Sequence, residues 1–126
     1  MLVVSFLFCA IPVSATAPIE PPLSTKEDMV DYATQQALNA QISPSVVLAV
    51  ISCESQWNPV AIGDHGQSHG LVQIHSPSHR DISIEQANDP KFAIGYLVSN
   101  LRDGNYLPVP HMLTEFSSAT VSLSGE

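Results

Sequence analysis

One segment constrains the fold more than any other, a helix signal that is apolar on every side. Residues 44–56 begin with Pro44, which suits the first position of a helix, and the run from Val46 to Ile51 contains no polar side chain. A helix of this kind has to be covered by other elements, so we expect it to be buried at the centre of the fold. It should end before Pro59, because proline disfavours helical geometry in the preceding residue.

Three further helices are expected around this central one. Ser24 and Glu27 form a candidate capping box for a helix that reaches about Ala40. Residues 83–88 indicate a short helix, and another begins with Asp89 as N-cap. That last helix should end at Gly104, and the intervening segment 58–81 is expected to form a long functional loop. Since no stretch indicates more than a small hairpin, the predicted class is mainly α.

The N-terminal residues differ in composition from the rest of the chain. The first charge is Glu20, and the apolar run from Leu2 to Val13 is shorter than the roughly 20 residues that span a bilayer. Small residues follow this run, which is typical of a cleaved signal peptide; a buried helix and an uncleaved anchor are the alternatives. We therefore expect export to the periplasm, the cell wall or the medium. The expected division is a signal peptide 1–17, a Pro-rich linker 18–23, a domain 24–104 and a loosely ordered tail 105–126.

Composition excludes several classes of function. The chain has 126 residues, which allows one domain, and 4 Lys+Arg against 12 Asp+Glu give a net charge of −8. This balance argues against binding of nucleic acid, and no nucleotide-binding motif is present. Without the leader only Cys53 remains, so no intramolecular disulfide can form. We expect Cys53 to be a small buried hydrophobic residue rather than a nucleophile.

Glu54 is the side chain best placed for chemistry. It lies near the end of the apolar helix, with Val50 and Val47 four and seven positions before it on the same face. An apolar environment favours the protonated form of a carboxyl group, as a general acid for a glycosidic oxygen requires. The alternative is a helix-terminal glutamate turned into solvent, and the pattern alone leaves both readings open.

Three ordered motifs resemble those of the soluble lytic transglycosylase (SLT) domain family, which is related to goose-type lysozymes. They are Glu54-Ser55-Gln56-Trp57-Asn58-Pro59, then Gly70-Leu71-Val72-Gln73-Ile74, then Asp89-Pro90 followed by Phe92-Ala93-Ile94 and Tyr96-Leu97. The resemblance extends from about Lys26 to Gly104. It implies a lysozyme-like fold of the α+β class, in which the helix 44–56 is central and the loop 58–81 borders the active site.

The resemblance also implies an activity. Members of this family cleave the β-1,4 bond between N-acetylmuramic acid and N-acetylglucosamine in peptidoglycan, without a metal or another cofactor. Carried over by motif position, Glu54 is the single acid and base, while Ser55, Gly70 and Gln73 orient it or contact the glycan. His75 stands where the family often has methionine, and it either binds an acetamido group or fills space. We expect a monomer that acts on glycan strands. The sequence leaves open whether it also has a partner in a secretion apparatus.

Several alternatives remain at this point. Asp64 or Asp81 could act as a second carboxylate, which would make the protein a hydrolytic muramidase. The Ala-Tyr-Asn-Ala-Gly motif of the family is absent, either because the subfamily is short or because the chain is truncated, and Tyr106 is a weak substitute. Without that motif a non-catalytic wall-binding module is a further reading. The histidines of the loop favour polar lining over zinc; they are His65, His69, His75 and His79. Each of the two pairs has i, i+4 spacing, but Gly, Ser and Pro lie between these histidines in a loop, so the helical spacing of zinc ligands does not apply.

Overall fold

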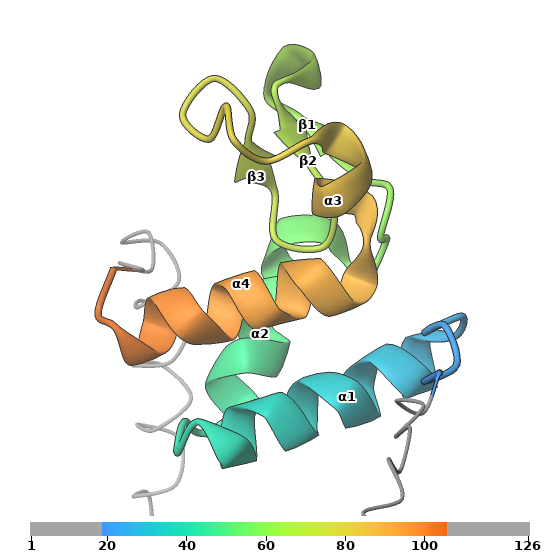
Figure 1. Cartoon of the computed structure of the whole chain (residues 1–126), viewed down its shortest axis with the longest axis vertical. Coiled ribbons are helices and arrows are strands. Elements are labelled where there is room, and N and C mark those ends of the chain that lie inside the picture. The colour runs from blue at the N-terminus through green and yellow to red at the C-terminus, as the bar shows by residue number, and fades with distance from the viewer. Residues whose placement is uncertain (1–18, 106–126) are drawn as a thin grey trace, which may run out of the picture.

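The computed structural model describes residues 19–105. The expected signal peptide 1–17, most of the expected tail and Tyr106 lie outside these residues. In chain order the elements are α1 Lys26–Asn39, α2 Pro44–Ser55, β1 Ile62–Gly63, the 3-10 turn η1 Asp64–Gly66, β2 Ser68–His69, β3 Ile74–His75, α3 Ile84–Asn88 and α4 Pro90–Arg102. The helices α1, α2 and α4 form one half of the molecule, and the small sheet with α3 forms the other (Figure 1). The predicted class, mainly α with a small sheet, is confirmed.

Helix α1 starts one residue later than the capping-box prediction. The backbone N–H of Asp28 donates to the Thr25 hydroxyl at 3.1 Å, and the Thr25 N–H donates to the Asp28 carboxylate at 3.0 Å. The prediction that Ser24 and Glu27 form this box is therefore wrong. The Asp28 carboxylate also accepts from the Ser24 hydroxyl at 3.4 Å, so it accepts hydrogen bonds from both Ser24 and Thr25.

Helix α2 is buried on one side only among the described residues. Val47, Val50 and Ile51 are buried, whereas Val46 is 41% exposed and Cys53 is exposed. Positions 46 and 53 are seven residues apart and so share a face, and this face is exposed. The prediction that Cys53 is a buried hydrophobic residue is wrong, because an apolar sequence does not tell which face the neighbouring elements cover.

The segment 58–81 contains a three-stranded antiparallel sheet in the order β1-β2-β3. His69 on the middle strand pairs with Ile62 on one side and with Ile74 on the other. Each strand has only two residues, which is too short for an alternating pattern to appear in the sequence. The expectation of a long loop with at most a hairpin therefore understates the order of this segment.

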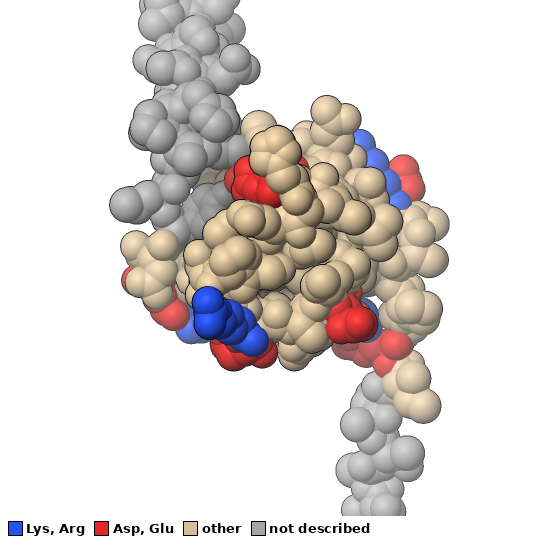
Figure 2. All heavy atoms as spheres, turned by 90° about the horizontal axis from the view of Figure 1, so that it is seen from above, with Lys and Arg blue, Asp and Glu red and all other residues tan. Residues whose placement is uncertain are grey.

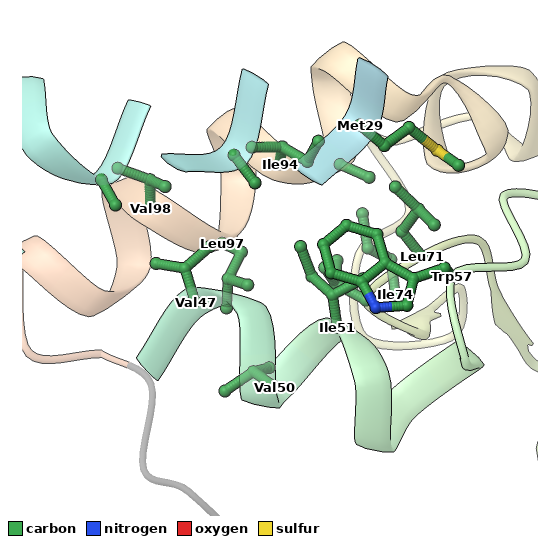
Figure 3. Packing of buried hydrophobic residues seen from close by; sticks show 14 of the residues in the cluster. Met29, Val47, Val50, Ile51, Trp57, Leu71, Ile74, Ile94, Leu97 and Val98 are labelled. Atoms are coloured by element: carbon green, nitrogen blue, oxygen red, sulfur yellow. The ribbon is translucent and has the colours of Figure 1, made fainter. Parts of the chain in front are cut away.

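Trp57 joins the two halves of the core. It is 8% exposed and lies against Ile51 of α2, with Leu71 and Ile74 of the sheet region beside it (Figure 3). Helix α4 completes the core with Ile94 and other buried residues. Because Trp57 follows the end of α2 so closely, this packing holds that helix end against the turn before β3.

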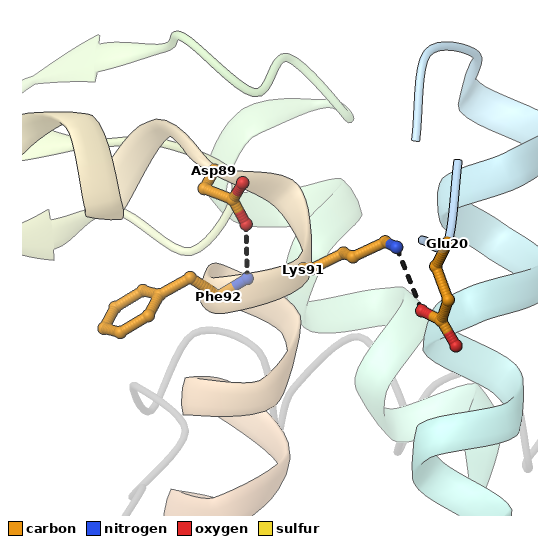
Figure 4. Close-up of polar contacts among 4 residues, drawn as sticks. All are labelled: Glu20, Asp89, Lys91 and Phe92. Carbon is orange, nitrogen blue, oxygen red and sulfur yellow. Dashed lines mark hydrogen bonds and ion pairs between the residues drawn. The ribbon is translucent and has the colours of Figure 1, made fainter. Parts of the chain in front are cut away.

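Helix α4 begins as predicted, and its first turn also holds the N-terminal segment. The N–H of Phe92 donates to the Asp89 carboxylate at 2.7 Å, and Pro90 occupies the first turn (Figure 4). Lys91 pairs with Glu20 at 3.0 Å, so part of the predicted linker lies against the domain. Across residues 19–105, no helix is long and apolar enough to cross a membrane.

Candidate functional site

Glu54 lies in the last turn of α2 and is half-buried. The helix ends one residue later, at Ser55, because Gln56 and Trp57 both adopt left-handed backbone conformations, with φ of 52° and 67°. Two consecutive non-glycine residues with positive φ are uncommon, and such backbone strain is concentrated at functional sites. The buried Trp57 ring supports this geometry from the core side.

Ser55 is also half-buried, and its hydroxyl donates to the carbonyl of Ile51 at 3.2 Å. Because this hydrogen bond fixes the orientation of the Ser55 hydroxyl, the residue next to Glu54 in the sequence has a fixed side chain. The sequence predicts a positioning role for Ser55, and this geometry is compatible with that prediction.

Gly70 adopts a φ of +79° and lies directly against α3. A Cβ atom at this position would collide with the carbonyl oxygen of Ala87. The resemblance predicts that Gly70 allows close approach of the backbone to the substrate. The structure gives this glycine a packing role beside α3, and no local signal in the motif indicates that contact.

Gln73 is half-buried and has a φ of 51°. Its side-chain Nε2 donates to the carbonyl of Ala61 at 3.2 Å and to that of Gly70 at 3.0 Å. Its Oε1 lies over Gly63, where an added Cβ atom would overlap it. The amide therefore links both ends of the β1–β2 hairpin, and its orientation is fixed before any ligand binds.

His75 has both ring nitrogens in hydrogen bonds. Its Nδ1 lies 2.8 Å from the Ser78 hydroxyl, and its Nε2 lies 3.2 Å from Oε1 of Gln67. The sequence alone does not predict the contact of His75 with Gln67, because it depends on the pairing of β2 with β3. These bonds hold the ring in the loop, and the two roles predicted for His75, binding of an acetamido group and filling of space, both stay predictions.

The other loop histidines do not converge on one point. His79 contacts Tyr96 of α4, with Nε2 3.1 Å from the phenol oxygen, while His65 is exposed on η1. His69 is 6% exposed in β2, and its Nδ1 has no hydrogen-bond partner within the described part of the chain. Residues 19–105 contain no group of three His, Cys, Asp or Glu side chains that could hold a metal ion.

The two candidate second carboxylates are exposed. Asp64 accepts from the Ser68 hydroxyl at 2.6 Å, which commits one of its oxygens to the first residue of β2. Asp81 lies near Tyr96: burial raises the pKa of the Tyr96 phenol, and the Asp81 carboxylate adds to that rise. Both acids are thus more exposed than Glu54, which is half-buried.

Charge is unevenly distributed over the end of the molecule that carries the sheet and α3. Figure 2 shows this end with most charged side chains near its rim and a large uncharged area in the middle. An uncharged surface suits hydrogen bonding and packing with sugars better than electrostatic attraction of a polyanion.

Comparison with known proteins agrees with these features. The family model of the transglycosylase SLT domain matches residues 31–105, which is more than half of the chain. No curated protein and no solved structure matches the chain. The matched range includes α2, the sheet, α3 and α4, and the resemblance expected from the three motifs is confirmed.

Proposed function

The chain belongs to the transglycosylase SLT domain family, and from this membership we propose that it is an exported lytic transglycosylase. Its substrate is the glycan strand of peptidoglycan. The bond that breaks is the β-1,4 linkage from N-acetylmuramic acid to N-acetylglucosamine. The expected signal peptide directs the enzyme to the periplasm, the cell wall or the medium.

One carboxyl group performs both steps of the proposed reaction. Glu54 first donates its proton to the glycosidic oxygen as the bond to the muramic C1 breaks. The resulting carboxylate then takes the proton of the muramic C6 hydroxyl, whose oxygen bonds to C1 and closes a 1,6-anhydro ring. The proton lost in the first step is regained in the second, so neither water nor a cofactor is consumed.

The observation that carries this proposal is the placement of Glu54. It is the half-buried carboxylate in the last turn of α2, directly before the strained backbone of Gln56 and Trp57, whereas Asp64 and Asp81 are exposed. A hydrolytic glycosidase usually needs a second carboxylate on the other side of the bond. The exposure of both candidates favours a mechanism that uses one acid alone.

The same proposal assigns glycan contacts to the neighbouring turn. Gln73 would accept a hydrogen bond from the sugar at Oε1, while its Nε2 stays on the carbonyls of Ala61 and Gly70. Ser55 and Gly70 contribute by holding the end of α2 and the turn in place. His75 contributes the exposed part of its ring to the surface beside Gln73.

The test is digestion of purified sacculi, with the muropeptides weighed by mass spectrometry. We expect products with anhydro ends, each lighter by one water than a reducing end. The Glu54→Gln variant should lose activity by on the order of 100-fold or more, since it cannot transfer the proton. Glu27→Gln is a matched control, because Glu27 is an exposed glutamate on α1 outside the proposed site.

Other products would identify the alternatives. If the products had reducing ends, and if the Asp64→Asn or the Asp81→Asn variant no longer formed them, the protein would be a hydrolytic muramidase. That result would contradict the single-acid mechanism. Binding to sacculi without release of fragments would show a wall-binding module. Release of anhydro products by Glu54→Gln at the rate of the unaltered protein would remove Glu54 from the mechanism.

A further inference from the structure

The hydrogen bonds around His75 define a second set of side chains, of which the proposed function uses only the exposed part of the His75 ring. His75 lies between Ser78 and Gln67, with Nδ1 2.8 Å from the hydroxyl and Nε2 3.2 Å from the amide oxygen. We propose that Ser78, His75 and Gln67 form a nucleophile, base and orienting group that hydrolyse small acyl esters, with acetyl esters of a hydroxyl compound as substrate.

The hydrogen-bond partners of His75 indicate which tautomer its neutral ring adopts. Oε1 of Gln67 can only accept, so the hydrogen of a neutral His75 ring lies on Nε2. Nδ1 then carries the lone pair, and the Ser78 hydroxyl is the donor in their contact. A base that accepts from a nucleophile and is oriented by an amide is the arrangement of Cys-His-Asn catalytic sites, here with serine in place of cysteine.

The backbone builds this geometry from the sheet. His75 pairs with Ser68, the residue after Gln67, and the N–H of Ser76 donates to the Gln67 carbonyl at 2.8 Å. The N–H of Ser78 donates to the His75 carbonyl at 3.0 Å, which turns the chain back toward the imidazole. Gln67 and Ser78 are exposed and His75 is half-buried, so a solute can reach the hydroxyl while the base is held in place.

The reaction balances with water as the only co-reactant. Oγ of Ser78 attacks the ester carbonyl carbon while its proton passes to Nδ1 of His75. The bond to the alcohol oxygen then breaks, and that oxygen takes the proton, leaving an acyl-serine. Water attacks the acyl carbon and gives a proton to Nδ1, after which the carboxylic acid leaves and Ser78 regains its proton.

The experiment uses the full chain with 4-nitrophenyl acetate as the probe. We expect turnover above that of free imidazole at equal concentration, and a rate lower by on the order of 100-fold in Ser78→Ala. Ser76→Ala is the matched control in the same turn. Cys53→Ser should keep the rate, which excludes acylation of the exposed thiol as the source of the signal.

Two further readouts separate catalysis from structure. Gln67→Leu removes the acceptor that holds the hydrogen on Nε2 and should lower the rate, whereas Gln67→Glu retains an acceptor and should largely restore it. Mass spectrometry after rapid quenching should locate the acetyl group on Ser78. Equal rates for Ser78→Ala and the unaltered protein, both folded by circular dichroism, would overturn the proposal. An acetyl group found only on Cys53, histidine or lysine would also overturn it.

Discussion

At the scale of single residues, Gly70 is the position where a small change should matter most. Its φ of +79° disfavours any side chain, and its Cβ would meet the Ala87 carbonyl, which belongs to the α3 backbone and cannot move aside. We expect Gly70→Ala to lower the free energy of unfolding by about 3 kcal/mol or more, combining left-handed strain with overpacking. Urea unfolding followed by circular dichroism measures this loss.

Gly104 separates the two causes of that loss. It also has a positive φ, of +71°, but nothing lies within 4 Å of an added Cβ. Gly104→Ala should therefore cost only the backbone strain, about 1–2 kcal/mol. If both variants lost equal stability, the contact with α3 would not be the reason that glycine occupies position 70.

At the scale of elements, the start of α1 makes a prediction about pH. Hydrogen bonds from Thr25 hold the pKa of the Asp28 carboxyl below its ordinary value. Because this pKa is lowered in the folded state, the contribution of Asp28 is present above its unfolded pKa and is lost as pH falls through the folded one. A carbon-detected NMR titration should give Asp28 a midpoint below the ordinary value of an aspartate.

Two variants at Thr25 test the cause of that shift. Thr25→Ala removes the hydroxyl but keeps the backbone N–H, so the midpoint of Asp28 should rise only part of the way toward its ordinary value. Thr25→Ser keeps both donors and should leave the midpoint low. A midpoint unchanged in Thr25→Ala would mean that another group stabilises the carboxylate.

Helix α4 contains a glycine that the fold does not require. Gly95 lies within Pro90–Arg102, beside a hollow between α1 and α4, and nothing lies within 4 Å of an added Cβ. Gly95→Ala should therefore raise the free energy of unfolding by about 1 kcal/mol, the difference in helix propensity. Thermal unfolding measures the gain, and a lower Tm would show that the α1–α4 contact depends on glycine.

The elements show what the sequence could predict. Helices α2, α3 and α4 were predictable because Pro44, Ser83 and Asp89 mark their starts chemically. The strands were not, since two-residue strands carry no period. The exposed face of α2 was not predictable either: an apolar run specifies that a helix is covered somewhere, and only the neighbouring elements decide where.

At the scale of the whole molecule, the candidate site was predictable in its residues but not in its contacts. The motifs located Glu54 and Gln73, because both lie next to strong local signals. The bond from Gln73 to Ala61 joins residues 12 positions apart. The bond from His75 to Gln67 joins residues 8 positions apart. Such contacts depend on strand register, which the sequence of a glycine- and histidine-rich loop specifies weakly.

Trp57 offers a test of whether the helices and the sheet unfold together. It is the only tryptophan of the chain, and it lies between Ile51 of α2 and the residues that flank β3. We expect its fluorescence and the helical circular dichroism signal to change at the same urea concentration, as one cooperative unit requires. Ile94→Val, a loss of about 1 kcal/mol in the α4 part of the core, should move both midpoints equally. A fluorescence change at lower urea than the helical signal, or a shift of one midpoint alone, would show that the sheet opens independently of the helices.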